Sequence, residues 1–448
     1  MRYQTALRPV GLKSTRRGDP ACTTGSVPGP MADVEPLRAL HYDLPAAGRL
    51  SDLVAPPYDV LDAEQRSELA GRSPYNIVHV DLPIGEDPYA QAAARFADWQ
   101  REGIVARDAD PALWAHEQRY RGPDGRERSR RGFFARVRVE DYGPGRIRPH
   151  ERTHPGPKED RLRLTRATAA NLSPIFALYS DPDGAAWGAL EPATHGKPWG
   201  EVTDADGTLH RLWRVGEPLA IARAQQTLRG VELLIADGHH RYETARVYAE
   251  EIGGEGPHRY VLMCLVALED PGLTVFPTHR LVRGLDDTRW KALDEAIAAD
   301  FSSRPVAREQ IAPPAGDGPL ELGYIDVRAR EPRRLTLTDQ TIADAALRDA
   351  SPAYRRLDTG VLEALLLKGA LRLSDDDISH LHDFGYARDA QQALALIDEG
   401  AYDVAFILRP TPVEQVREVA ASGENMPPKS TYFIPKLLTG LLFNPLRP

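Results

Sequence analysis

The chain has 448 residues, of which 42% are hydrophobic and 27% are charged, and its formal net charge is −9. These proportions are typical of a soluble globular protein that is large enough for two or three domains. The net negative charge disfavours a general nucleic-acid-binding surface, and the longest apolar run, residues 260–268, is too short to cross a bilayer. Cys22 and Cys264 are the only cysteines, which excludes a disulfide framework and a four-thiolate metal site and favours a reducing cytoplasm.

The composition along the chain predicts its division into domains. Residues 1–30 are basic and rich in Gly, Pro, Ser and Thr, so we expect a disordered tail or a start codon placed too early, with Met31 as the first residue. Residues 31–302 are predicted to form an N-terminal and central α+β domain. Residues 303–318 are rich in Pro, Ala and Gly and indicate a loop or linker, and residues 319–448 are predicted to form a C-terminal α/β domain.

Two polar residues near the start of the first domain follow rigid turns. Asp59 follows Pro-Pro-Tyr, and Asn76 follows Pro-Tyr. Proline restricts the backbone on both sides of itself, and polar residues on such turns often line pockets. We therefore expect Asp59 and Asn76 in a substrate pocket; the alternative is ordinary turn chemistry, in which both side chains cap their own backbone.

A β-hairpin is predicted over residues 115–120 and 132–140, which alternate apolar and polar residues around a Gly-Pro-Asp-Gly turn. The densest basic run of the chain lies near this turn and includes Arg126, Arg128, Arg130 and Arg131. Nucleic-acid binding is disfavoured because this run has no interleaved aromatic residues on which bases could stack. We predict a solvated hairpin tip.

The segment His150-Glu-Arg-Thr-His154 matches the zinc-protease pattern His-Glu-x-x-His. That pattern requires a helix that places both histidines on one face beside the metal. Prolines at positions 149, 155 and 157 leave no regular helix over the segment. We therefore reject a metalloprotease and expect no zinc.

A Pro-rich loop is predicted instead, followed by a helix that begins near Leu162. Site-type residues crowd this loop: His150, Glu151, Lys158, Asp160 and Arg161. Glu151 is a candidate general base, Asp160 is a candidate ligand for Mg²⁺, and Lys158 and Arg161 can neutralise phosphate. An exposed, salt-bridged loop is the alternative.

Residues 231–245 indicate a strand, a tight turn and a helix. An apolar run ends at Asp237-Gly238, and good helix-forming residues follow from Arg241. The helix N-terminus and its dipole favour an anion, Gly238 permits close approach of the backbone, and Arg241 can hold two phosphate oxygens. We expect phosphate contacts from Gly238, His240 and Arg241, with Asp237 and His239 as catalytic candidates beside His150 and Glu151. A turn with a satisfied histidine pair is the alternative.

Two later segments contain further candidates for the same site. His279 and Arg280 lie on a predicted turn and could contribute to the anion site or cap an element. In residues 426–440, Lys429, Ser430 and Thr431 can meet a phosphate, whereas helix capping is the alternative role of the hydroxyls. The apolar spacing of residues 437–442 predicts a helix.

These stretches resemble known families. The Asp-Gly-His-His-Arg segment resembles the Gly-x-His-Arg phosphate-contact motif of the ParB and sulfiredoxin superfamily, which includes nucleotide-binding switches, sulfiredoxin and free-serine kinases. The chain as a whole resembles the prokaryotic family named domain of unknown function 1015. The matching stretches are 55–60, 74–76, His150-Glu151 with Thr153, 158–161, 236–245, 277–280 and 426–440.

The residues and the resemblance together favour a nucleotide-dependent phosphotransferase that acts on a small metabolite, for which an amino acid such as serine is a candidate. Phosphoryl transfer needs cations, a carboxylate that orients the nucleophile, and a hard metal ion. We therefore expect ATP or ADP with Mg²⁺ or Mn²⁺, with oxygen ligands from Glu151, Asp160 or Asp237. The partners expected are this nucleotide and a small-molecule substrate, with no membrane.

Two alternatives remain open. A phosphatase or phosphohydrolase could use the same residues, and a ParB-like switch would bind nucleotide without catalysis. The switch predicts a DNA-binding element, but the sequence has no helix-turn-helix with a basic recognition helix. Sulfiredoxin chemistry is disfavoured because residue 239 is histidine rather than cysteine. The predicted fold is α+β, with a mixed sheet that contains the Asp-Gly-His-His-Arg turn and a C-terminal α/β unit, and the site is expected where the two meet.

Overall fold

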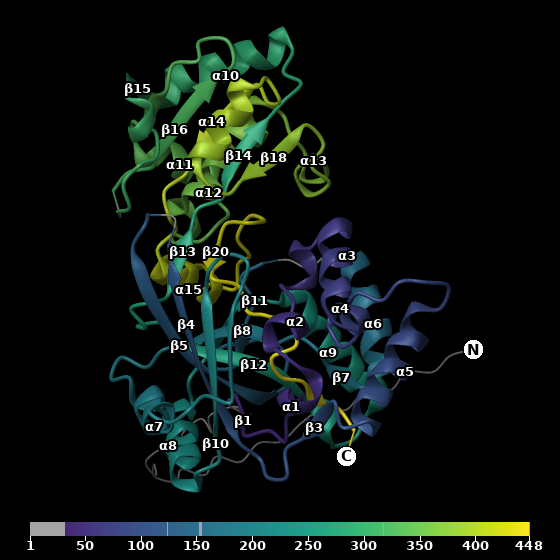
Figure 1. The fold of residues 1–448 in the computed structure, drawn as a ribbon. Helices are drawn as coiled ribbons and strands as arrows, with labels where there is room; N and C mark the ends of the chain where they lie inside the picture. Colours follow the sequence, from purple (N-terminus) through teal and green to yellow (C-terminus); the bar gives the residue numbers. More distant parts are fainter. Residues whose placement is uncertain (1–31, 123, 152–154, 317, 448) are drawn as a thin grey trace, which may run out of the picture. The chain divides into compact units, whose positions relative to one another are not determined.

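A mixed sheet of nine strands dominates the first part of the described chain (Figure 1). The computed structural model describes residues 32–122, 124–151, 155–316 and 318–447, so the predicted tail over residues 1–30 lies outside the described residues. The strands are β1 (Val34–Glu35), β4 (Leu113–Arg121), β5 (Glu127–Arg138), β6 (Ile147–Arg148), β8 (Ile175–Tyr179), β9 (Gly200–Thr203), β10 (Leu209–Val215), β11 (Leu233–Asp237) and β12 (Tyr260–Ala267). Their order is β6-β11-β8-β12-β5-β4-β10-β9, and β1 also pairs with β5. The pairs β6–β11 and β8–β12 are parallel, and the other pairs are antiparallel.

Both faces of this sheet are buried. Successive side chains of a strand point to opposite faces, so Leu113 and Trp114 of β4 belong to different hydrophobic clusters. The cluster of Leu113 includes side chains from α7 (Ala185–Thr194), α8 (Pro218–Leu228) and α9 (His239–Ile252). The cluster of Trp114 includes side chains from α15 (Val413–Ala421) and from residues 426–442. The late part of the chain therefore covers one face of the sheet.

A group of helices forms a separate core beside this sheet. Its helices are α1 (Leu44–Ala47), α2 (Leu50–Leu53), α3 (Ala63–Arg72), α4 (Val78–Asp81), α5 (Pro88–Arg101) and α6 (Pro155–Thr168), with the 3₁₀ turn η1 (Tyr58–Val60). Helix α6 begins at Pro155, earlier than predicted, because proline is tolerated in a first helical turn, where its missing N–H has no intrahelical partner. Lys158, Asp160 and Arg161 consequently lie on a helix rather than in the predicted loop.

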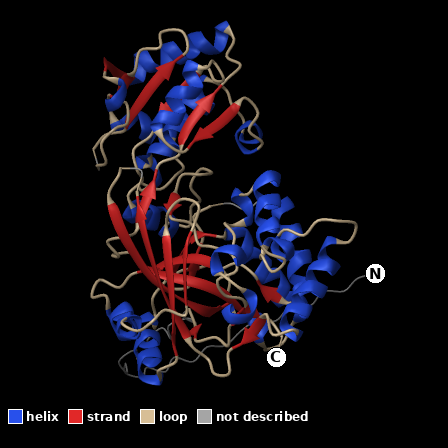
Figure 2. Ribbon diagram, viewed as in Figure 1, coloured by secondary structure: helices blue, strands red, loops and turns tan. Residues whose placement is uncertain are grey.

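The second sheet consists of six antiparallel strands within the described residues. These are β14 (His279–Val282), β15 (Phe301–Pro305), β16 (Glu321–Asp326), β17 (Arg333–Leu337), β18 (Phe384–Ala387) and β19 (Val404–Ile407), in the order β15-β17-β16-β19-β14-β18. The helical segments after β12 are η2 (Pro257–Arg259), α10 (Asp287–Asp300), η3 (Arg308–Gln310), α11 (Gln340–Ala346), η4 (Tyr354–Arg356), α12 (Asp358–Leu362), the π-helix η5 (Glu363–Ala370), α13 (Asp375–Ser379) and α14 (Ala390–Asp398). Helix α14 packs on one face, whereas α10, α11, α12 and η5 pack on the other (Figure 2). Because β14 and β15 precede residue 306, this sheet begins before the predicted boundary at residues 303–318, and the division into domains there stays a prediction.

Residues 426–446 return to the first part of the chain. Strand β20 (Tyr432–Ile434) pairs with β13 (Thr274–Phe276), and β21 (Asn444–Pro445) pairs with β7 (Ala170–Asn171). A further small sheet joins β2 (Leu40–Tyr42) to β3 (Val105–Arg107). The helix predicted over residues 437–442 is wrong: these leucines are buried in non-helical chain, interrupted by Gly440 at a φ of 94°.

The predicted fold class, mixed α and β with a mixed parallel and antiparallel sheet, is confirmed. None of the helices in the described ranges is long and apolar enough to cross a membrane.

Candidate functional site

The strand, turn and helix around Asp237 place several polar groups together. Strand β11 ends at Asp237, Gly238 adopts a left-handed conformation with a φ of 97°, and α9 begins at His239, earlier than predicted. A Cβ atom on residue 238 would lie 3.0 Å from Cζ of Arg241. Glycine is therefore favoured for its backbone conformation, and any larger residue would also press on the guanidinium of Arg241.

Asp237 forms ion pairs with two cations. Its Oδ2 accepts a hydrogen bond from Nη2 of Arg241 at 2.9 Å, and its Oδ1 accepts one from Nζ of Lys436 at 3.0 Å. Arg241 also donates to the carbonyl of Pro174. Burial alone would raise the pKa of Asp237, but Lys436 and Arg241 hold it well below its ordinary value. Asp237 is therefore a carboxylate at every pH near neutrality.

Two buried histidines lie next to this ionic cluster. Nδ1 of His150 donates to the carbonyl of Ile235 at 2.7 Å, which leaves Nε2 to accept from Oγ1 of Thr431 at 2.8 Å. The backbone N–H of His150 donates to Nε2 of His239 at 3.3 Å, and the two rings lie 4.7 Å apart, edge to face. Burial lowers the pKa of His150 to about 4 and that of His239 well below its ordinary value. Both rings are neutral and join β11, α9 and residues 426–440.

Glu151 follows His150 directly and has a different electrostatic environment from Asp237. Burial and the charge of Asp237 raise its pKa to about 7, although Lys436 and Lys429 oppose this effect. Its side chain is 29% exposed, and its Oε1 lies 3.9 Å from Nε2 of the neutral His150, beyond hydrogen-bond distance. Glu151 is therefore a carboxyl group that can accept or release a proton near neutral pH.

A cavity of about 500 Å³ adjoins these residues. It is lined by Tyr58, Asp59, Glu151, Asp237, Gly238, His239, His240, Arg241, Glu363, Asp375, Ile378, Leu381, Tyr386, Met426, Pro428 and Lys429. The cavity brings together predicted site residues from four separate stretches of the sequence: Asp59, Glu151, the segment 237–241 and Lys429. Its volume is in the range of small-molecule sites.

Several other predicted site residues do not line this cavity. Asn76 is fully buried; its Nδ2 donates to the carbonyls of Asp52 and Val54, and its Oδ1 accepts from the backbone N–H of Val78. Ser430 is buried between Thr359 and the carbonyl of Pro427. The contact of Asn76 with Val78 is the turn capping that was the alternative for it, whereas its other contacts, and that of Ser430 with Thr359, join segments far apart in the sequence.

The pair His279-Arg280 lies on strand β14 rather than on the predicted turn. Nδ1 of His279 accepts from the backbone N–H of Leu408 at 3.2 Å. Arg280 is buried, donates to the carbonyls of Thr278 and Pro428, and lies 5.3 Å from the ring centre of Tyr386. Arg280 therefore supports the loop before Lys429 from behind the cavity wall.

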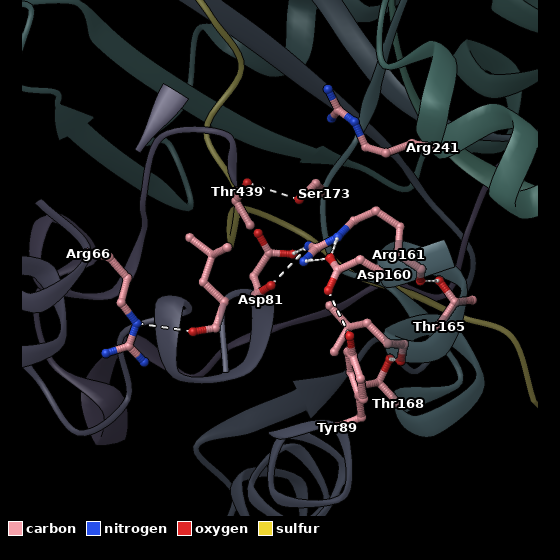
Figure 3. Close-up of polar contacts among 12 residues, drawn as sticks. Arg66, Asp81, Tyr89, Asp160, Arg161, Thr165, Thr168, Ser173, Arg241 and Thr439 are labelled. Atoms are coloured by element: carbon pink, nitrogen blue, oxygen red, sulfur yellow. Dashed lines mark hydrogen bonds and ion pairs between the residues drawn. The ribbon is translucent and has the colours of Figure 1, made fainter. Parts of the chain in front are cut away.

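Asp160 and Arg161 belong to a second ionic cluster (Figure 3). Nη1 of Arg161 lies 3.1 Å from Oδ1 of Asp81, and its Nη2 lies 2.6 Å from Oδ2 of Asp160. Asp160 also accepts a hydrogen bond from the hydroxyl of Tyr89 at 2.8 Å. Arg161 lines a smaller cavity of about 40 Å³, and neither Asp160 nor Lys158 is among the residues that line either cavity.

Two of the carboxylates expected to bind magnesium, Asp160 and Asp237, have other partners in the structure. Asp160 and Asp237 are each already bonded to two other groups, whereas Asp59 is exposed at the cavity. Across the described ranges, no group of three or more His, Cys, Asp and Glu side chains is arranged to hold a metal ion. Thr153 and His154 of the His-Glu-x-x-His segment lie outside the described residues.

Several residues of this site have no recognisable signal in the sequence. Lys436 follows a proline within the run 426–440, and only its contact with Asp237 distinguishes it from an ordinary surface lysine. Glu363 and Tyr386 line the cavity from η5 and β18. Their local sequence contains no motif, so only the tertiary structure identifies them.

The fold and site define a mixed α/β protein with a cavity beside the N-terminus of a helix, where carboxylates and cations meet. The chain belongs to the family described as Protein of unknown function (DUF1015), whose model matches residues 34–398. None of the curated proteins compared with the chain matches it.

Solved structures with a similar chain course include three proteins. A conserved hypothetical protein from Pyrococcus furiosus is 16% identical, with a TM-score of 0.32, over 64% of this chain and 87% of that one. A free serine kinase in complex with AMP is 14% identical, with a TM-score of 0.33, over 64% and 83% of the two chains. SbnI with a C-terminal truncation, from Staphylococcus aureus, is 12% identical, with a TM-score of 0.34, over 68% and 85%.

Proposed function

We propose that the protein is a nucleotide-dependent phosphotransferase that acts on a small metabolite. The observation that supports this proposal best is the position of Glu151, a carboxyl group with a pKa of about 7, beside the same cavity as the N-terminus of α9. A general base is most effective when its pKa lies near the working pH. Glu151 therefore suits the removal of a proton from a substrate hydroxyl.

The proposed phosphate site lies at the start of α9. The first backbone N–H groups of a helix have no intrahelical partners and favour an anion, and Gly238 allows close approach. Asp237 and Pro174 hold the guanidinium of Arg241 in place, and its remaining donors can face a phosphate. The exposed Lys429 lines the same cavity and adds a second cation.

In the proposed reaction, the substrate hydroxyl attacks the terminal phosphorus of the nucleotide. Glu151 accepts the hydroxyl proton as the new P–O bond forms, and the P–O bond to the shorter nucleotide breaks, so that the electron pair leaves with its oxygen. Arg241 and Lys429 stabilise the charge on the transferred and leaving oxygens. Asp237 remains ionised between its two cations and orients Arg241.

Magnesium or manganese would neutralise phosphate oxygens when it is bound with the nucleotide. Of the carboxylates, the exposed Asp59 fits this role best because Asp160 and Asp237 are occupied by other groups. The cavity has carboxylates at Glu363 and Asp375, both of which pair with Lys368, and a cation at Lys429. Such a surface of both signs suits a zwitterionic substrate, including an amino acid such as serine.

The proposal is tested with the purified full chain. Calorimetric titration with ATP, ADP and CTP measures binding, and ³¹P NMR with serine and other small hydroxyl compounds, with and without Mg²⁺, detects transfer. Formation of a phosphorylated metabolite supports the phosphotransferase. Nucleotide binding without turnover would indicate a switch, and release of phosphate from monoesters without nucleotide would indicate a phosphohydrolase.

Arg241→Ala tests the location of the phosphate site. Because it removes a charge-assisted contact, nucleotide affinity should fall about tenfold, or about 1.4 kcal/mol. Arg246→Ala is the matched control: Arg246 lies five residues further along α9 and pairs with Asp141 and Glu243. Equal affinity of both variants and the parent would place the phosphate elsewhere.

A further inference from the structure

Arg130 is the residue of the basic run that does not behave like a hairpin tip. The sequence predicts that Arg126, Arg128, Arg130 and Arg131 are all solvated, and that prediction is wrong for Arg130, which is 1% exposed on β5. Alternation along the strand explains the difference, because Arg131, the next residue, points to the opposite face and is exposed. The guanidinium of Arg130 lies 4.5 Å from the ring centre of Phe176.

The hydrogen bonds of Arg130 all end on neutral oxygens. Its Nε donates to Oε1 of Gln118 at 3.0 Å, its Nη1 donates to the carbonyl of Ile434 at 3.2 Å, and its Nη2 donates to the carbonyl of Pro435. Within the described part of the chain, no carboxylate lies within ion-pair distance of this guanidinium. Burial of a cation without a neighbouring carboxylate costs free energy, so the hydrogen bonds of its donors must offset this cost.

Together with one from Gln118, these hydrogen bonds fix the backbone of residues 434–436, which includes Lys436. Gln118, on the neighbouring strand β4, donates from Nε2 to the carbonyl of Lys436 at 3.0 Å. Arg130 and Gln118 therefore hold three consecutive carbonyls, those of Ile434, Pro435 and Lys436. Because the lysine side chain is long and flexible, fixing its backbone limits where the ammonium can lie.

We propose that Arg130 is a positioning residue that, with Gln118, fixes the backbone of Lys436 so that its ammonium lies 3.0 Å from the carboxylate of Asp237. Arg130 touches neither the cavity nor a substrate. It acts through Lys436 on Asp237, and through Asp237 on Arg241. Its effect on turnover rests on the proposed phosphotransferase function, whereas its effect on Asp237 does not.

The test compares Arg130→Met with Arg131→Met. Methionine keeps an unbranched side chain but removes all donors and the guanidinium that lies over Phe176, and Arg131 is an exposed residue on the same strand. Carboxyl ¹³C NMR measures the pKa of Asp237, with Asp237→Asn used to assign the signal. The pKa should rise by about one unit or more in Arg130→Met, where the charge of Arg130, which also acts on Asp237, is lost together with the support of Lys436. Arg130→Lys keeps that charge, so a rise of the pKa in this variant isolates the displacement of Lys436. Arg131→Met should leave it unchanged.

A double mutant separates positioning from general loss of structure. Turnover should fall about tenfold or more in Arg130→Met and in Lys436→Met. If Arg130 acts through Lys436, the variant with both changes should be within about twofold of Lys436→Met alone. Arg130→Lys keeps the buried charge and is measured alongside Arg130→Met. The pKa of Asp237 should rise there too, because one ammonium cannot bind the oxygens of Gln118, Ile434 and Pro435 together.

The outcomes separate this inference from the proposed function. An unchanged pKa of Asp237 in a folded Arg130 variant would overturn the inference, as would losses of turnover that multiply in the double mutant. If no protein transfers phosphate but the pKa of Asp237 rises, the proposed function fails and the positioning role stands.

Discussion

Glu151 and Asp237 line the same cavity but differ in the charges around them. Asp237 contacts Arg241 and Lys436, and its pKa is held well below its ordinary value, whereas burial and Asp237 itself raise the pKa of Glu151 to about 7. Two carboxyl groups with separated pKa values commonly have separate roles in catalysis. We assign proton transfer to Glu151 and orientation of the cations to Asp237.

Exchange of each carboxylate for its amide distinguishes these roles. Glu151→Gln keeps the shape of the side chain but removes its basicity, so kcat should fall about a hundredfold or more while nucleotide affinity stays within about twofold. Asp237→Asn should weaken nucleotide binding, because Arg241 and Lys436 lose their partner. Single-turnover kinetics and calorimetry measure both effects. If only Asp237→Asn abolishes the chemical step, the assignments are reversed.

The raised pKa of Glu151 also predicts the pH dependence of turnover. A general base works in its deprotonated form, so kcat should rise by up to about tenfold per pH unit below pH 7 and level off above it. His150 does not add a limb between pH 5 and 8, because its pKa is about 4. Initial rates from pH 5 to 8 give the profile. The rising limb should be absent in Glu151→Gln, and a limb that persists there would have to come from another group.

At the scale of elements, local patterns predicted the strand, turn and helix around Asp237, since an apolar run, a glycine and helix-forming residues lie in sequence order. The same reasoning failed for residues 437–442. Their helical spacing is real, but the backbone pairs elsewhere, with Thr439 opposite Ala55, and Gly440 adopts a positive φ. A short apolar run is compatible with a helix and with an irregular buried segment, and its tertiary contacts determine which of the two forms.

The turn before α9 permits a matched comparison of two glycines. Gly238 and Gly184 both precede helices in the left-handed conformation, but a Cβ on Gly238 meets Arg241, whereas a Cβ on Gly184 meets open space. Gly184→Ala should cost about 1 kcal/mol in unfolding free energy from backbone strain alone. Gly238→Ala should cost about 2 kcal/mol or more and should also weaken nucleotide binding, because Arg241 is displaced. Chemical denaturation and calorimetry measure these effects; equal behaviour of the two variants would contradict the role of Gly238.

For the whole molecule, the sequence predicts that several separate stretches contribute to one site, but not all the residues that line it. Asp59, Glu151, residues 237–241 and Lys429 had local signals, such as rigid turns and a helix start. Tyr386 and Lys436 had none, because their proximity to the site depends on how β18 and residues 426–446 pack. The buried Arg130 was missed for the same reason: a basic run looks exposed until strand pairing places one of its members inside.

Buried neutral histidines predict how the stability of the molecule depends on pH. The pKa of His279 is lowered to about 4 by burial and by Arg280, whereas an unfolded histidine titrates near 6.5. As the pH falls, His279 is therefore protonated at a lower pH in the folded state than in the unfolded state. This histidine should lower the unfolding free energy by about 1.4 kcal/mol per pH unit between pH 6.5 and 4 and should have no effect above that window.

His279→Asn isolates this contribution. The asparagine oxygen can accept from the backbone N–H of Leu408 in place of Nδ1 but does not titrate. Urea unfolding at pH 7 and pH 4.5 should show a shallower loss of stability in the variant than in the parent. Identical losses would mean that the pKa of His279 is the same in the folded and unfolded states.

The return of residues 426–446 to the first sheet also orders events during synthesis. A ribosome makes the chain from its N-terminus, and early segments begin to fold before later ones emerge. Asp237 and Arg241 are thus present well before Lys436, and His150 before Thr431. A nascent chain that has reached residue 425 contains Glu151, Asp237 and Arg241 but lacks Lys436, the second cation that pairs with Asp237. Asp237 therefore gains the second of its two cation partners only when the last segment of the chain has been made and has packed against the first sheet.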